Sequence, residues 1–235
     1  MFRRRREVDE TDAVDAVDDV DDVDAVAEDG PTTGPWDPAD LPQDDSTVRV
    51  ELGGVSIPVV DRVEVRVEVV EDVVVAAALA DGASQLVVNA FAAPKSAGIW
   101  AEVRQEITDS LRNGGGAAEQ VDGPFGPELR ARIPNDTGGH EQARFIGVDG
   151  PRWFLRGLIT GPAATDPSQA ARLESVFRDI VVVRGGEAMA PRDPLPLHLP
   201  REIVEQAAAA ADDAADPEER RLQLQERGPE ITEIQ

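Results

Sequence analysis

Hydrophobic residues change their spacing several times along residues 48–184, and each spacing predicts a different element. Over residues 62–70, RVEVRVEVV, valines alternate with charged residues, which is typical of an antiparallel strand with one face in water. Over residues 97–112, and again after Asp166, apolar residues recur at helical spacing. Further strands are predicted at residues 48–52, 55–59, 73–80, 85–92, 118–121, 128–133 and 180–184. This order predicts an α+β fold, with a mainly antiparallel sheet and two principal helices packed on one face.

The segment 143–161, ARFIGVDGPRWFLRGLITG, gives the strongest hairpin signal. Its Asp149 and Gly150 favour a two-residue turn, because both tolerate positive φ angles. Pro151 lacks an N–H, so a four-residue loop over residues 148–151 is the alternative. Both turns predict the same register, with Ile146 opposite Trp153, Arg144 opposite Leu155 and Phe145 opposite Phe154.

Side chains alternate along a strand, so this hairpin has two predicted faces. The predicted core face carries Ile146, Val148, Trp153, Leu155 and Ile159. The opposite face carries Phe145, Arg152, Phe154, Arg156 and Leu158. Guanidinium groups stack on rings and pair with carboxylates, so this second face could bind a peptide or an anion. The alternative is structural, with arginine stems lying over apolar surface and their charged ends in water.

Arg130 and Arg132 point outward from the predicted strand 128–133. If this strand neighbours the hairpin, its two guanidinium groups share a face with those of Arg152 and Arg156, which suits a carboxylate-rich or phosphate-bearing partner. The candidate binding residues are Arg130, Arg132, Phe145, Arg152, Phe154 and Arg156. In the alternative interpretation, Glu64 and Glu68 neutralise these arginines as cross-strand pairs.

Both predicted helices have recognisable ends. Ser96 is the expected N-cap of the first helix, and the glycines at 114–116 end it. Asp166, Pro167 and Gln169 supply a cap, a first-turn proline and a capping-box partner for the second helix. The segment 194–200, PLPLHLP, is expected to be extended and to strap its leucines over the domain, or alternatively to serve as a proline-rich ligand.

Charge divides the 235 residues into three parts. The net charge is −24, and residues 1–45 carry 16 acidic and four basic side chains. We therefore predict a disordered acidic tail at 1–46, one α+β domain at 47–200 and a charged, Ala-rich tail at 201–235. The Asp-rich segment is further expected to fold back on the arginine face. Unchanged amide exchange at residues 152–156 after deletion of residues 1–45 would rule this out.

Candidate chemistry is sparse. The chain has no cysteine and two histidines, which excludes disulfides, thiol nucleophiles and cysteine zinc sites. The acidic segment 11–29 lacks the glycine and final glutamate of a calcium loop, and no nucleophile elbow or dinucleotide fingerprint occurs. We predict no catalytic residue, no metal and no cofactor, so whether the protein is an enzyme stays uncertain, leaning to no.

Two further features bear on location and partners. The longest apolar run, residues 73–80, is too short to cross a bilayer. The negative net charge argues against nonspecific binding to nucleic acid. We expect a cytoplasmic protein without membrane insertion. Its expected partner is another protein, and an acidic segment is one form that this partner could take.

Five stretches occur in order: AFAAPKSAGIW, GPFGPELRA, RFIGVDGPRWFLRG, VFRDIVVVRGG and PLPLHLP. Together they resemble an uncharacterised actinobacterial family, the domain of unknown function 3710, over most of residues 48–200. The resemblance implies a cytoplasmic bacterial protein with acidic tails, and it transfers no catalytic residue. The order of elements also looks like that of small secretion-chaperone domains. These expectations favour a noncatalytic protein-binding or chaperone-like module, with a small-ligand enzyme as the alternative.

Overall fold

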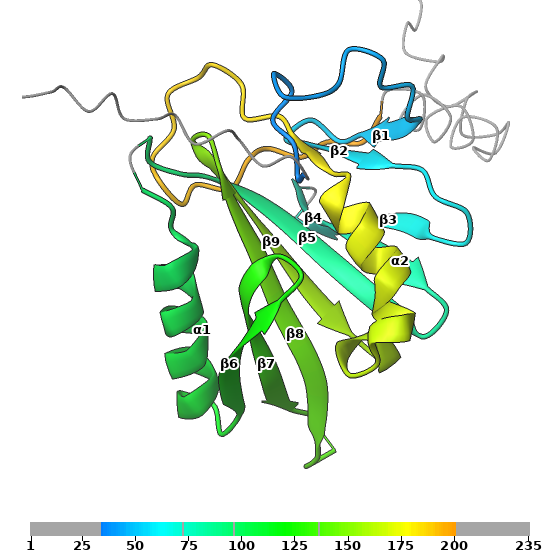
Figure 1. Cartoon of the computed structure of the whole chain (residues 1–235). Helices are drawn as coiled ribbons and strands as arrows, with labels where there is room; N and C mark the ends of the chain where they lie inside the picture. Colours follow the sequence, from blue (N-terminus) through cyan, green and yellow to red (C-terminus); the bar gives the residue numbers. More distant parts are fainter. Residues whose placement is uncertain (1–33, 72, 96, 136, 201–235) are drawn as a thin grey trace, which may run out of the picture. The chain divides into compact units, whose positions relative to one another are not determined.

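The computed structural model describes residues 34–71, 73–95, 97–135 and 137–200. Residues 1–33 of the predicted N-terminal tail (1–46), the predicted tail at 201–235 and the expected cap Ser96 lie outside the described residues. Within them, seven strands form one sheet in the order β3-β4-β5-β9-β8-β7-β6, and three form a smaller sheet in the order β1-β2-β10 (Figure 1). All the strand pairs in both sheets are antiparallel. The predicted α+β fold with a mainly antiparallel sheet and two principal helices is confirmed.

The large sheet contains the longer strands: β3 (Glu64–Val70), β4 (Val73–Asp81), β5 (Ser84–Ala92), β6 (Ala117–Gly123), β7 (Gly126–Pro134), β8 (His140–Gly150) and β9 (Trp153–Thr160). The small sheet contains β1 (Arg49–Glu51), β2 (Val55–Pro58) and β10 (Val181–Val182). The helices are α1 (Trp100–Asn113), the 3-10 turn η1 (Pro162–Ala164) and α2 (Pro167–Arg178).

The β8–β9 hairpin turns two residues later than predicted. Gly150 pairs with Trp153, so Pro151 and Arg152 form the turn. Proline suits the first turn position because its φ is already fixed, and Arg152 takes the positive φ of 67° at the second. The predicted register is therefore wrong: Ile146 lies opposite Gly157, Arg144 opposite Ile159, Phe145 opposite Leu158 and Asp149 opposite Phe154. The shift is an even number of residues, so each side chain keeps its predicted face.

One face of the large sheet carries the main core. Trp153, Leu155 and Ile159 of β9 pack there with Ile146 of β8, and each of the four is at most 1% exposed. The apolar stripe of α2 covers them, and so does the small sheet. Residues that α2, β2 and the connection between β1 and β2 contribute are Leu173, Val176, Phe177, Val55, Ile57 and Leu52. The predicted core face of the hairpin is thus confirmed.

The opposite face is covered by α1, which corrects the prediction that both helices lie on one face. Trp100 of α1 stacks on Phe154, with ring centroids 5.5 Å apart, and Ile99 joins the same buried cluster. Trp153 and Phe154 are consecutive in β9, so they project from opposite sides of the sheet. Each large ring needs its own cover, and Figure 1 shows α1 and α2 well apart with β8 and β9 between them.

The segment 192–198 completes the sheet where β4 and β5 separate. β4 pairs with β5 only as far as Val88, and beyond it the backbone N–H of Leu195 donates to the carbonyl of Ala90 at 2.9 Å. Leu195 and Leu197 are buried. The predicted strap is confirmed for these two leucines.

Candidate functional site

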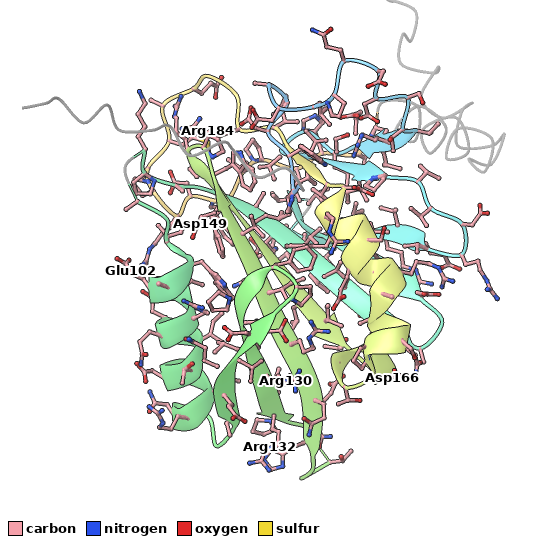
Figure 2. All side chains as sticks on the ribbon, in the orientation of Figure 1. Glu102, Arg130, Arg132, Asp149, Asp166 and Arg184 are labelled. Atoms are coloured by element: carbon pink, nitrogen blue, oxygen red, sulfur yellow. The ribbon has the colours of Figure 1, made fainter. Side chains whose placement is uncertain are left out.

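The predicted face of four arginines does not form. Arg130 pairs across the sheet with Arg144, which pairs with Ile159, so Arg130 lies on the α2 side. Arg156 is two residues after Phe154 on β9, so both side chains lie on the α1 side of the sheet. In addition, β8 separates β9 from β7, the strand of Arg130. Figure 2 shows Arg130 and Arg132 at the end of the sheet away from Asp149. The predicted neutralising pairs do not form either, because Glu64 bonds Arg66 of its own strand.

The other predicted binding residues are dispersed. Arg152 lies in the hairpin turn and lines a cavity of about 290 Å³ with Asp37 and Arg184. Phe154 is 1% exposed under α1, and Phe145 is half-buried against the same helix. Their role in binding stays a prediction.

A half-open sheet face does form beside α1. The side chains of β5 that point to this side are half-buried, and so are Arg156 and Leu158 of the neighbouring β9. Cross-strand pairing joins Val87 to Leu158 and Asn89 to Arg156. We call this set the half-open face: Val87, Asn89, Phe91, Arg156 and Leu158. It is a short apolar strip with one charged and one amide side chain in its middle.

A cleft of about 160 Å³ opens where this face meets α1 and the strap. We call it the Arg156 cleft, and its lining is Phe91, Ile99, Val103, Glu106, Phe154, Arg156 and Arg192. The apolar lining comes from β5, β9 and α1, and the charged groups come from β9, α1 and the strap. Four segments of the chain therefore meet at one place.

Arg156 is held by neutral partners. Its Nη2 donates to Oδ1 of Asn89 at 3.0 Å, and its guanidinium carbon lies 5.4 Å from the centroid of the Phe91 ring. No carboxylate of the described residues lies within 4.0 Å of its nitrogens. Burial lowers the pKa of this guanidinium below its ordinary value. The site thus holds a partly desolvated cation without an anion.

Arg192 at the rim has the opposite environment. Its two terminal nitrogens donate to Glu106 at 2.7 Å and to Glu102 at 2.8 Å, which ties the strap to α1. The hydrogen bonds of Glu106 and Glu102 raise the pKa of Arg192. Glu106 is therefore already paired and leaves Arg156 as the unpaired charge of the cleft.

A buried ion network on the α2 side was missed by sequence reasoning. Arg144 donates two hydrogen bonds to Glu128, at 3.0 and 2.8 Å, and pairs with Glu174 of α2 at 2.8 Å. Burial lowers the pKa of Arg144, but the hydrogen bonds and charges of the two glutamates outweigh it and raise the pKa above its ordinary value. The side chain of Glu128 is only 2% exposed. Strand alternation places Arg144 and Ile146 on the core side, and this was the signal that could have found the network.

The histidines and carboxylates of the described residues form no further candidate site beyond the Arg156 cleft and the Arg144 network. His140 pairs with Pro134 at the exposed start of β8, and His198 lies exposed in the strap against Gly53. Within the described residues, no group of three histidines or carboxylates is close enough to hold a metal ion. In the same part of the chain, no helix is both long and apolar enough to cross a membrane.

Comparison with known proteins gives one result. No curated protein matches the chain. A family model described as "Protein of unknown function (DUF3710)" matches residues 34–206, which includes all ten strands and both main helices of the described part. The match covers well over half of the sequence, so the chain belongs to this family of proteins of unknown function.

Proposed function

We propose that this protein is a noncatalytic protein-binding module that receives an extended segment of a partner protein on the half-open face. The observation that carries the proposal is Arg156, which has no anionic partner and lies beside Asn89 in the middle of an otherwise apolar strip. A strip that only covered the core would need no charge there, because burying a guanidinium without an anion has a desolvation cost.

The spacing of the strip suits an extended chain. Residues two apart on a strand repeat about every 6.6 Å, which is also the spacing of alternate side chains in an extended peptide. Val87, Asn89 and Phe91 present such a row on β5. A partner segment laid along it places one side chain on Val87 and Leu158 and the next near Arg156.

Charge favours an acidic segment. The protein as a whole is strongly negative, with a net charge of −24, yet the half-open face itself carries only the positive charge of Arg156. A carboxylate in the segment pairs with that charge, whereas a basic segment is repelled by it and attracted to the acidic remainder.

Free strand edges provide a second line of support. Among the described residues, β3 pairs only with β4, and β6 only with β7. Val69, Val70 and Val73 at the β3–β4 turn are each more than half exposed. Edge strands and apolar tips of this kind are surfaces on which other chains dock.

The alternative prediction, a small-ligand enzyme, requires a roomy polar cavity that converges on a base. The Arg156 cleft is small, and its one carboxylate, Glu106, is bonded to Arg192. The volume is below the 300–1,000 Å³ that is usual for small-molecule sites. A second, polar cleft of about 800 Å³ lies between the β4–β5 turn and α2, but its one carboxylate, Asp81, is paired with Arg172. Neither cleft offers a free base, which favours the binding module.

Selection from a displayed library of random nine-residue peptides tests the proposal on the full chain. Peptides recovered on the unmodified protein should bind Leu158→Lys at least tenfold more weakly, because burial of a leucine side chain is worth a factor of about ten or more. Val48→Lys is the matched control, since Val48 is 71% exposed outside the half-open face. Failure to recover any peptide, or equal loss with both variants, would contradict the proposal.

A further inference from the structure

We infer that the Arg156 cleft is the recognition pocket of this surface, and that it takes one aspartate or glutamate side chain with a small aliphatic residue next to it in the partner segment. The inference rests on the proposed function and adds the chemistry that the bound segment must carry. It concerns Arg156, Asn89 and the apolar side chains of Val103 and Phe154.

The guanidinium is fixed in place before any ligand arrives. Asn89 accepts a hydrogen bond from Nη2 of Arg156, and its own Nδ2 donates to the carbonyl of Val75 at 3.0 Å. The ring of Phe91 lies beside the guanidinium. An arginine with a restrained position loses less conformational entropy when it binds a carboxylate.

Donors remain for an incoming carboxylate. Only Nη2 of Arg156 has a hydrogen-bond partner among the described residues, so Nε and Nη1 are available. Neither is among the fully buried nitrogens that lack a partner, so a ligand can reach them. Nε–H and Nη1–H point to different sides of the guanidinium, so a carboxylate oxygen accepts one charge-assisted hydrogen bond from either of them.

Two other arginines near the sheet are already paired with carboxylates and so have no anion to gain. Arg144 is saturated by Glu128 and Glu174, and Arg192 by Glu102 and Glu106. Arg104 of α1 has no carboxylate partner in the described part of the chain either, but its guanidinium carbon lies 5.4 Å from the centroid of the Trp100 ring and does not line the cleft. Among the described residues that line the cleft, Arg156 is therefore the cation without an anion. Partial burial strengthens the pairing there, because the local dielectric constant is lower than in water.

The size of the cleft selects an anchor rather than a whole ligand. Its 160 Å³ corresponds to about five water molecules, each of which occupies about 30 Å³. This accommodates a carboxylate and one short apolar group. Val103 and Phe154 supply the apolar walls, so a small aliphatic side chain beside the acid completes the fit.

The test uses the same displayed peptide library with the full chain and three variants. Arg156→Gln removes the charge, and Asn89→Asp supplies a carboxylate from within the protein that competes with the ligand. Arg132→Gln is the matched control, because it removes an exposed arginine on the other face of the sheet. Circular dichroism melting curves establish that each variant is folded.

The recovered peptides should share an acidic residue next to Val, Ile, Leu or Ala. Replacing the acid of such a peptide by its amide, aspartate by asparagine or glutamate by glutamine, should weaken binding to the unmodified chain at least tenfold. The acidic peptide should also bind the variants Arg156→Gln and Asn89→Asp at least tenfold more weakly than the unmodified chain. Binding to Arg132→Gln should be unchanged.

Three outcomes overturn the inference. The recovered peptides could share no acidic residue and still bind Leu158→Lys more weakly than the unmodified chain. The proposed function would then stand, but the Arg156 cleft would not be its recognition pocket. Acidic peptides that bind Arg156→Gln as well as the unmodified chain place the carboxylate elsewhere. If a chain that lacks residues 11–29 binds the library peptides at least tenfold more tightly than the full chain, an intramolecular segment rather than a partner fills the cleft.

Discussion

The carboxylate of Asp149 accepts a hydrogen bond from the backbone N–H of Ile99 at 2.8 Å, across 50 residues of sequence. It also accepts from the N–H of Trp100 at 3.2 Å. The first turn of α1 therefore has its cap on β8, and the helix begins at Trp100 without a side-chain cap of its own. This contact aligns α1 with the hairpin and so fixes one wall of the Arg156 cleft.

Replacing Asp149 by alanine should lower the free energy of unfolding by about 1 kcal/mol, which is typical of a lost helix cap. Amide exchange of Ile99 and Trp100 should accelerate more than exchange elsewhere. Asp149→Asn is the control, because its side-chain oxygen still accepts a hydrogen bond and should retain most of the stability. Uniform acceleration across the domain would contradict a local capping role.

Replacing Arg144 by methionine should destabilise the domain by about 3–5 kcal/mol, because Glu128 is then a buried charge without a partner. Denaturant unfolding measures this loss. The double variant Glu128→Leu with Arg144→Met should recover most of it, since both charges are gone. Equal destabilisation in the single and double variants would show that shape, and not charge pairing, is what the site requires.

Gly147→Ala should cost about 1–3 kcal/mol by overpacking. An added Cβ meets Cδ2 of Trp100 at 2.7 Å and Cε2 of Phe154 at 2.8 Å, so α1 has to move away from the sheet. Near-ultraviolet circular dichroism of Trp100, together with urea unfolding, reports both effects. Gly186→Ala is the control, because its Cβ meets nothing within 4 Å. Similar results for both glycines would contradict close packing of α1.

The cap of α2 predicts a pH dependence in acid. Hydrogen bonds from Gln169 and Ser168 lower the pKa of Asp166 from 3.8 to about 2. The ionised carboxylate therefore stabilises the fold above about pH 4, and this contribution is lost as the pH falls towards about 2. The melting temperatures of the unmodified chain and Asp166→Asn should differ at pH 6 and converge near pH 2. A difference that stays constant with pH would refute the assignment.

Residues 34–46 are expected to contribute to the stability of the domain. The N–H of Trp36 donates to the carbonyl of Ile180, and the carbonyl of Trp36 accepts from the N–H of Val182, both at 2.8 Å. The carboxylate of Asp37 accepts a hydrogen bond from Nε1 of Trp153 at 3.1 Å. At about 1 kcal/mol each, a chain that begins at residue 47 should be about 3 kcal/mol less stable than one that begins at residue 34. Equal melting temperatures would support the predicted boundary at residues 46 and 47.

Local sequence signals predicted a helix end correctly where the capping residue lies next to the helix in sequence. Asp166 caps α2 as predicted, because its carboxylate accepts a hydrogen bond from the backbone N–H of Ser168. The side chain of Gln169 donates to this carboxylate, whereas in the predicted capping box it would accept from the N–H of Asp166, which bonds Pro162 instead. For α1 the same reasoning chose Ser96, and the cap comes from Asp149 instead. A cap donated by another strand leaves no trace at the helix end, so spacing cannot find it.

The candidate site was predicted only in part. Arg156 and Phe154 were named, yet the grouping with Arg130 and Arg132 was wrong, because it assumed that β7 and β9 are neighbours on one face. Asn89, Val103 and Arg192 were not named as site residues. Their importance comes from the strap and α1 meeting β5, and the strap contacts join residues more than 100 positions apart, such as Leu195 and Ala90.

The sequence alone determined the fold class, the two helices and which hairpin side chains share a face, because these depend on spacing and on the chemistry of neighbouring residues. The tertiary structure decided the strand order, the side of the sheet on which each helix packs and which arginines acquire an anion. Those outcomes depend on burying Trp153 and Phe154 on opposite faces at once, and this requirement can be satisfied only when the whole chain packs.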